Sequence, residues 1–310
     1  MGFLNRRRVL HAALVVGLVV TLVGTSPAAR ASVKVFACEP EWAALAEAIA
    51  GDLVSVSAAT TALQDPHFIQ ARPSLIAKVR GADLVICSGA QLEIGWLPAL
   101  LQKANNPAVR PGAPGYFEAS SFVLRLGATD DVDRAGGDIH PFGNPHVQTD
   151  PHNIATIAKA LAARLQEIDP AESSRYQERA DAFLSRWLEA VGVWEKRAAP
   201  LRGLRVITHH NSWVYLVKWL GMEQVATLEA VAGLPPTATF LSRLNRDFKD
   251  GGADVIIRSP YQDDKPSQWL AERSGIPAIE LPLTVGGTAE AHDLFGLFDN
   301  IIDQLLEATP

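Results

Sequence analysis

Short apolar runs rich in β-branched residues alternate along most of this chain with longer segments of helical periodicity. The runs that we expect to form strands are Val33–Ala37, Leu53–Ser57, Asp83–Cys87, Leu204–Thr208, Ala253–Ile257 and Ala278–Leu281. Helical periodicity covers Trp42–Ile49, Pro73–Val79, Leu92–Lys103, Trp213–Leu220, Ala238–Phe248, Pro266–Arg273 and Leu294–Leu306. This alternation predicts an α/β fold, in which helices cover parallel sheets.

The middle of the chain lacks strand patterns and looks entirely helical. Asp150-Pro151 and Asp169-Pro170 are both good helix starts, because aspartate caps a helix and proline is tolerated in its first turn. The second helix should continue to about Arg197, since apolar residues recur there at helical spacing. Those residues are Tyr176, Ala180, Phe183, Leu184, Trp187, Leu188, Val191 and Trp194. We therefore predict two α/β lobes, residues 32–168 and 199–310, joined by a linking helix over residues 169–198.

The N-terminal residues carry the three parts of a secretory signal peptide. Arg6–Arg8 form a basic start, residues 9–24 are almost entirely apolar, and Ala29–Ala31 reads Ala-Arg-Ala, a small-x-small cleavage site. The alternative is a membrane anchor, but the apolar run is shorter than the roughly 20 residues that cross a bilayer. We expect residues 1–31 to be cleaved and the mature protein to be periplasmic. The adjacent arginines leave open whether export follows the general or the twin-arginine route.

The charge of the chain argues against a nucleic acid or an anionic membrane as partner. The sequence has 28 Lys and Arg against 34 Asp and Glu, a net charge of −6. Removing residues 1–31 takes away four arginines and no acid, so −6 becomes −10. Proteins that bind nucleic acid present a basic patch, and none is evident here. An acidic chain is compatible with a cationic ligand.

Several histidines follow turn-forming residues or the end of a predicted strand. His67 follows Asp-Pro, His146 follows Asn-Pro, and His209 and His210 follow the predicted strand that ends at Thr208. Ligands of open α/β sheets bind outside the carboxyl ends of the strands, and neutral imidazole suits Zn²⁺. His209 and His210 are adjacent and must point in different directions, so at most one of them should ligate.

The remaining histidines of the mature chain have simpler interpretations. His152 lies at a predicted helix start and His292 lies near the last helix, where we expect both to be solvent-exposed. His140 belongs to the acidic, glycine-containing loop Asp130–Gly143 and is interpreted as either a loop residue or an auxiliary ligand. The loop directly precedes Asn144, so we expect it to form a mobile flap over a site.

The sequence resembles the zinc- and manganese-binding solute receptors of bacterial ABC importers over essentially the whole mature chain. The resemblance rests on three motifs, Asp65-Pro66-His67, Gly143-Asn144-Pro145-His146, and His210-Asn211-Ser212-Trp213-Val214-Tyr215. It implies that His67, His146 and His210 bind the metal in a cleft between two lobes. It also implies that the protein is a receptor rather than an enzyme, which delivers its metal to an ABC permease of the inner membrane. We expect the protein to be a monomer.

The sequence departs from the family pattern where a fourth ligand is often found. An Asp near the last strand is replaced by the stretch Glu-Leu-Pro-Leu around Pro282, and a Glu after the preceding strand is replaced by Ser259. The long histidine-rich loop of many zinc receptors is also missing. The fourth position is therefore left to water or to a carboxylate, for which Glu39, Asp263 and Glu280 are candidates.

Three imidazoles favour Zn²⁺ over Mn²⁺, which prefers carboxylate and water, although Ni²⁺ and Cu²⁺ also bind imidazole.

The main alternative function is a secreted zinc hydrolase, because three histidines with an open position also describe catalytic zinc. The sequence has no His-Glu-x-x-His and no Gly-x-Ser-x-Gly, so the general base or nucleophile of such an enzyme is missing. A zinc chaperone or an adhesin would use the same site.

The chain has two cysteines, Cys38 and Cys87, at the ends of the first and third predicted strands. If these strands are neighbours in the sheet, the two residues lie within the span of a disulfide, and the periplasm is oxidising. We predict a disulfide. Two buried free thiols, or soft ligands for a second metal, are the other interpretations.

Overall fold

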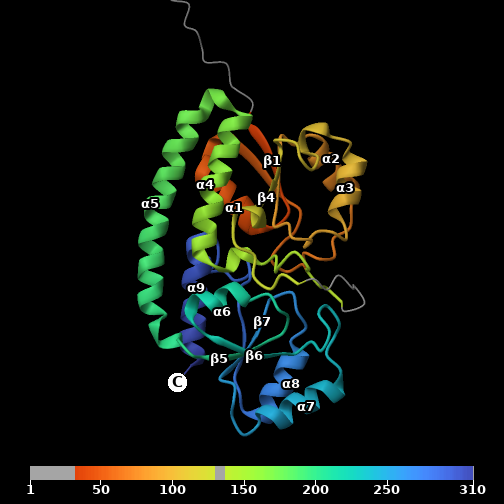
Figure 1. The fold of residues 1–310 in the computed structure, drawn as a ribbon, viewed down its shortest axis with the longest axis vertical. Helices are drawn as coiled ribbons and strands as arrows, with labels where there is room; N and C mark the ends of the chain where they lie inside the picture. Colours follow the sequence, from red (N-terminus) through yellow and green to blue (C-terminus); the bar gives the residue numbers. More distant parts are fainter. Residues whose placement is uncertain (1–31, 130–136, 310) are drawn as a thin grey trace, which may run out of the picture. The chain divides into compact units, whose positions relative to one another are not determined.

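The computed structural model describes residues 32–129 and 137–309 (Figure 1). The predicted signal peptide, residues 1–31, and residues 130–136 of the predicted flap lie outside the described residues. None of the helices in the described ranges is both long enough and apolar enough to span a membrane.

The first half of the described chain contains a four-stranded parallel sheet with the order β2-β1-β3-β4. Its strands are β1 (Val33–Ala37), β2 (Val54–Ala58), β3 (Leu84–Cys87) and β4 (Tyr116–Glu118). Side chains alternate between the faces, as the pleat of a strand requires. Val35 belongs to one hydrophobic cluster, and its neighbour Phe36 belongs to another on the opposite face.

A second parallel sheet repeats this order as β6-β5-β7-β8. Its strands are β5 (Arg205–Thr208), β6 (Glu223–Thr227), β7 (Val255–Arg258) and β8 (Ala278–Glu280). The predicted α/β fold of two lobes with parallel sheets is therefore confirmed. Both sheets have the strand order that produces a switch point between their two central strands, where α/β proteins commonly bind ligands.

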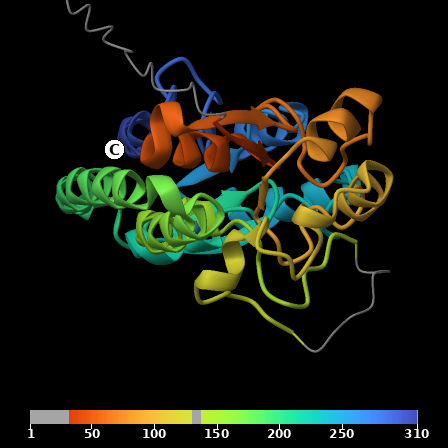
Figure 2. The same ribbon diagram turned by 90° about the horizontal axis from the view of Figure 1, so that it is seen from above.

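Helices cover both faces of the sheets. They are α1 (Pro40–Ala50), α2 (Pro73–Arg80), α3 (Leu97–Ala104), α4 (Pro151–Ile168), α5 (Ser173–Arg197), α6 (Val214–Leu220), α7 (Ala238–Phe248), α8 (Lys265–Ser274) and α9 (Leu294–Ala308). Helices α4 and α5 pack against each other on one side of the first sheet, and α2 and α3 lie on the other side (Figures 1 and 2). The last helix, α9, returns to contact both α5 and α1.

One continuous hydrophobic core joins the two sheets. It contains Val35 of the first sheet and Val206 of the second, together with the buried face of α5. Trp187 and Trp194 of α5 are almost completely buried and pack against Phe298 of α9. Burial of large aromatic side chains is strongly favourable, so this helix fixes the lobes through a shared core.

The structure corrects several details of the predicted elements. Strands β4 and β6 were missed, because neither has a run of apolar β-branched residues. Leu188 was expected on the buried face of α5 but is 52% exposed, because one step of 100° along the helix carries it away from Trp187. The segment Pro170–Glu172 forms a separate 3₁₀ turn before α5 begins, and α3 begins only at Leu97.

The predicted disulfide joins Cys38 to Cys87, with a Cα–Cα separation of 4.8 Å. Strands β1 and β3 are neighbours in register, with Ala37 opposite Ile86, so the residues that follow these two in the chain, Cys38 and Cys87, face each other. Both cysteines are fully buried. The bridge thus clamps the two central strands at the carboxyl edge of the first sheet.

Candidate metal centre

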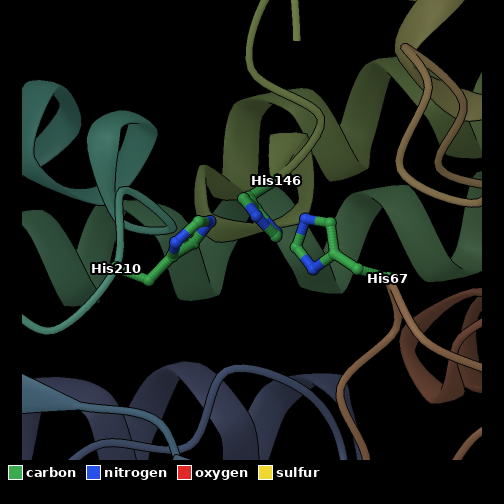
Figure 3. Close-up of side chains that lie close together, drawn as sticks. All are labelled: His67, His146 and His210. Carbon is green, nitrogen blue, oxygen red and sulfur yellow. The ribbon is translucent and has the colours of Figure 1, made fainter. Parts of the chain in front are cut away.

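His67, His146 and His210 come together from three separate segments of the chain (Figure 3). One ring nitrogen from each lies within 4.8 Å of the others. The ring centroids are 5.8 Å apart for His67 and His146, 5.5 Å for His67 and His210, and 6.0 Å for His146 and His210. All three residues are at least nine-tenths buried, at 7%, 1% and 6% exposure. Three converging, nearly equidistant imidazoles form a suitable cage for one transition-metal ion.

His67 is held by the carboxylate two residues before it. Asp65 accepts a hydrogen bond from the backbone N–H of His67 at 3.0 Å, and its same oxygen lies 2.7 Å from the ring Nδ1. Burial raises the pKa of Asp65, but the hydrogen bond and charge of His67 outweigh it and leave the pKa lowered. An ionised Asp65 keeps the proton on Nδ1, so Nε2 is the lone pair available to a metal.

His210 has an equivalent partner from a different element. It follows β5, and its Nδ1 lies 2.7 Å from Oε2 of Glu229, which follows β6. Glu229 also accepts a hydrogen bond from the backbone N–H of Gly233. This carboxylate fixes the tautomer and the ring orientation of His210, as carboxylates commonly do for metal-binding histidines.

His146 is positioned through its backbone. Oδ1 of Asn144 accepts the N–H of His146 at 3.0 Å, and the hydroxyl of Tyr215 donates to the carbonyl oxygen of Asn144 at 2.7 Å. Neither ring nitrogen of His146 has a hydrogen-bond partner among the described residues. Burial, followed by the nearby His67 and His210, lowers its pKa well below the usual value. A neutral, buried ring with an unused nitrogen is well suited to metal binding.

The other candidate residues lie outside this group of three. His209 faces Glu229 at 3.8 Å, Glu280 pairs with Arg258 at 2.7 Å, and Asp263 lines the adjoining cavity. Glu39 belongs to a separate buried cluster with Ser88.

His152 and His292 are exposed, as expected, at 52% and 74%.

A cavity of about 500 Å³ adjoins the histidines. Its acidic lining residues are Asp65, Asp138, Glu229 and Asp263, against one basic residue, Lys265. Concentrating one sign of charge in a concave surface raises the local concentration of counter-ions. The cavity is therefore suited to attracting cations toward the histidines.

Sequence reasoning missed Glu229 and the orienting role of Asp65. Glu229 follows β6, the strand that had no apolar pattern, so nothing placed it near His210. Asp65 was in the first motif, and its position two residues before His67 is the spacing of a turn in which aspartate bonds a nearby backbone N–H. That spacing was the available signal.

Comparison with known proteins decides the family. The family ZnuA, described as "Zinc-uptake complex component A periplasmic", matches residues 35–308. The chain belongs to this family. A ZnuA crystal structure superposes with a TM-score of 0.75 at 21% identity, covering 90% of this chain and 100% of that one. A manganese-bound periplasmic metal-binding protein from Candidatus Liberibacter asiaticus gives a TM-score of 0.70 at 17% identity, covering 88% and 100%.

Curated relatives of the ZnuA-family chain carry other metals in their names. The manganese ABC transporter substrate-binding lipoprotein PsaA of Streptococcus pneumoniae is 24% identical over 275 residues, 86% of this chain and 85% of PsaA. The iron ABC transporter substrate-binding lipoprotein MtsA of Streptococcus pyogenes serotype M1 is 24% identical over 260 residues, 82% of this chain and 80% of MtsA. The chain is thus a substrate-binding component of a metal ABC importer, a class of binding proteins rather than enzymes.

Proposed function

We propose that this protein captures Zn²⁺ in the periplasm with His67, His146 and His210 and delivers it to the permease of an ABC importer. The observation that carries the proposal is the convergence of three buried ring nitrogens within 4.8 Å of one another. Two of the rings are oriented by carboxylates, which is how proteins commonly prepare imidazole for a metal.

The donor atoms support zinc as the metal. The ligand group contains three imidazoles, and no carboxylate of the described residues belongs to it. Imidazole suits Zn²⁺, whereas Mn²⁺ prefers carboxylate and water. Asp65 and Glu229 reach the site, but each lies against a histidine Nδ1, so they act through the rings.

The proposed function places the mature protein in the periplasm and makes the permease of an ABC importer its partner. The N-terminal signal pattern supports export and cleavage, with a mature receptor of residues 32–310. We propose lobes over residues 32–168 and 199–310 joined by a linker over 169–198, a monomer in solution, and docking of the metal-loaded form on a permease. The acidic lining of the adjoining cavity, which includes Asp138 and Asp263, would gather cations at low concentration.

A secreted zinc hydrolase is disfavoured by the roles of the nearby carboxylates. Such an enzyme needs a base that can take a proton from metal-bound water. Asp65 and Glu229 are the acids in contact with the ligand rings, and both hold Nδ1 of a histidine. A zinc chaperone or adhesin would share the site, and genes for an ABC permease and ATPase beside this gene would favour import.

Competition titrations of the metal-free protein with Zn²⁺, Mn²⁺ and Ni²⁺ test the proposal. Wild type should bind one Zn²⁺ in preference to Mn²⁺, and alanine at His67, His146 or His210 should weaken zinc binding by more than the roughly 10–100-fold cost of losing an outer-sphere partner. His292→Ala is the matched control, because this histidine is exposed. If His209→Ala abolishes binding while His210→Ala does not, the assigned ligand is wrong.

A further inference from the structure

The three histidines leave one position of a tetrahedral zinc site without an assigned protein ligand. Structural zinc sites usually have four ligands. The residues directly after β7 and β8 supply no acid, because they are Ser259 and Leu281, and both are fully buried. Among the residues described, no carboxylate joins the three converging nitrogens. Another donor is needed to complete the shell.

His140 lies next to the three histidines, at a distance from His67 that would let both rings bind the same zinc ion. Its Nε2 lies 3.3 Å from Nε2 of His67. Two nitrogens bound to one zinc at 2.0–2.1 Å in a tetrahedron lie roughly 3.3–3.4 Å apart. The ring centroids of His140 and His67 are 5.4 Å apart, close to the spacings within the triad, and His140 is 6.5 Å from His146. The two facing nitrogens therefore already span one edge of a tetrahedron.

The backbone around His140 is fastened on both sides. Asp138 N–H donates to the carbonyl oxygen of Ala232 at 2.9 Å, and Thr129 N–H donates to that of Pro141 at 3.0 Å. Gly137 forms a β-bridge with Ala232, at a positive φ of 90°, where a side chain would collide with the Ala232 carbonyl. These bonds hold the described part of the segment in place, so the backbone that carries His140 is preorganised.

We propose that His140 is the fourth zinc ligand, so that the bound ion is held by four imidazoles. The inference rests on the proposed function, because it assigns a further ligand to the same site. His140 lies outside the mutually close group of three nitrogens, so its ring must move toward His210. A cavity of about 230 Å³ lined by both His140 and His210 gives it room to do so.

A fourth imidazole would also set the metal preference. Imidazole favours Zn²⁺, whereas carboxylate and water, the donors it replaces, favour Mn²⁺. The residues directly after β7 and β8 are Ser259 and Leu281 rather than acids, and a histidine faces the site from the segment 137–143 instead. His140 would therefore act as a specificity-determining residue among relatives named for other metals.

Zinc K-edge X-ray absorption, which counts bound imidazoles, tests the proposal on the zinc-loaded protein. The wild-type spectrum should show four imidazoles bound to zinc. The spectrum of His140→Ala should show three imidazoles and one oxygen ligand. Zinc affinity of His140→Ala should fall by more than the roughly 10–100-fold cost of losing an outer-sphere partner, with a smaller preference for Zn²⁺ over Mn²⁺. His152→Ala is the control, since this exposed histidine is hydrogen-bonded to Asp150 away from the triad.

A wild-type spectrum with three imidazoles, or a His140→Ala protein with unchanged zinc affinity, would overturn the proposal. His140→Gln keeps a polar side chain of similar length and should lose one imidazole in the same way, which guards against a folding defect in the alanine variant. If alanine at His67, His146 or His210 leaves zinc binding intact, the proposed function itself fails. That result is distinct from failure of His140 alone.

Discussion

Glu41 on α1 is a buried acid whose charge should cost stability at neutral pH. It is 1% exposed. The hydroxyl of Thr284, which follows β8 of the second sheet, donates a hydrogen bond to Glu41 Oε2. Burial raises the pKa of Glu41 from 4.5 to about 7, although the Thr284 hydrogen bond acts in the opposite direction. Two further buried acids, Glu39 and Glu93, lie nearby, and burial also raises the pKa of each.

The sign of the effect follows from proton linkage. Between pH 4.5 and 7 the folded protein keeps a proton on Glu41 that the unfolded chain releases, so the stability present below pH 4.5 is lost as the pH rises through about 7. Glu41→Gln removes the charge but keeps an acceptor for Thr284. With 1.36 kcal/mol for each unit of pKa shift, the variant should gain on the order of 3 kcal/mol over wild type at pH 8 and little near pH 4.5.

Urea unfolding of the metal-free proteins at several pH values measures this difference, and omitting metal keeps ligand binding out of the comparison. Glu47→Gln is a matched control, because Glu47 is an exposed residue of the same helix. Its stability should follow that of wild type at every pH. A Glu41→Gln protein that parallels wild type from pH 4.5 to 8, or that is less stable at pH 8, would refute the reasoning.

Three further outcomes follow from the structure. Replacing Cys38 and Cys87 together with alanine should lower the free energy of unfolding by about 4 kcal/mol in the chain-entropy model, as measured by denaturant titration against oxidised wild type; an unchanged midpoint would contradict this. Asp65→Asn and Glu229→Gln should each weaken zinc binding roughly 10–100-fold while the ligand rings remain, as competition titration would show; unchanged affinity in both would remove their orienting role. Hydrogen exchange across residues 137–143 should slow on zinc binding, and equal rates in both states would contradict ligation by His140.

The sequence predicted the parts of the fold that have a clear hydrophobic period. The predicted runs Val33–Ala37 and Ala253–Ile257 correspond to β1 and β7, mostly buried strands at the centre of each sheet. Strands β4 and β6 were missed because their residues are partly exposed and of mixed type. Both lie at sheet edges, where pairing with the neighbouring strand, rather than amino-acid composition, determines that a strand forms.

The candidate site could be anticipated only as far as its motifs extend. Turn-forming residues before His67 and His146 made them candidates, and the family resemblance implied that they bind metal together with His210. The structure brings the three residues together. The partnership of Glu229 with His210 depends on the pairing of β5 with β6, which no local pattern encodes. The placement of His140 depends on the bridge between Gly137 and Ala232, a contact between distant parts of the chain.

The most direct test of the account is a crystal structure of the zinc-loaded protein with anomalous data collected at the zinc absorption edge. We expect one strong peak at about 2.0–2.1 Å from a ring nitrogen of each of His67, His146 and His210. A peak held instead by carboxylates of the acidic cavity, such as Glu229 and Asp263, with the three imidazoles unligated, would contradict it.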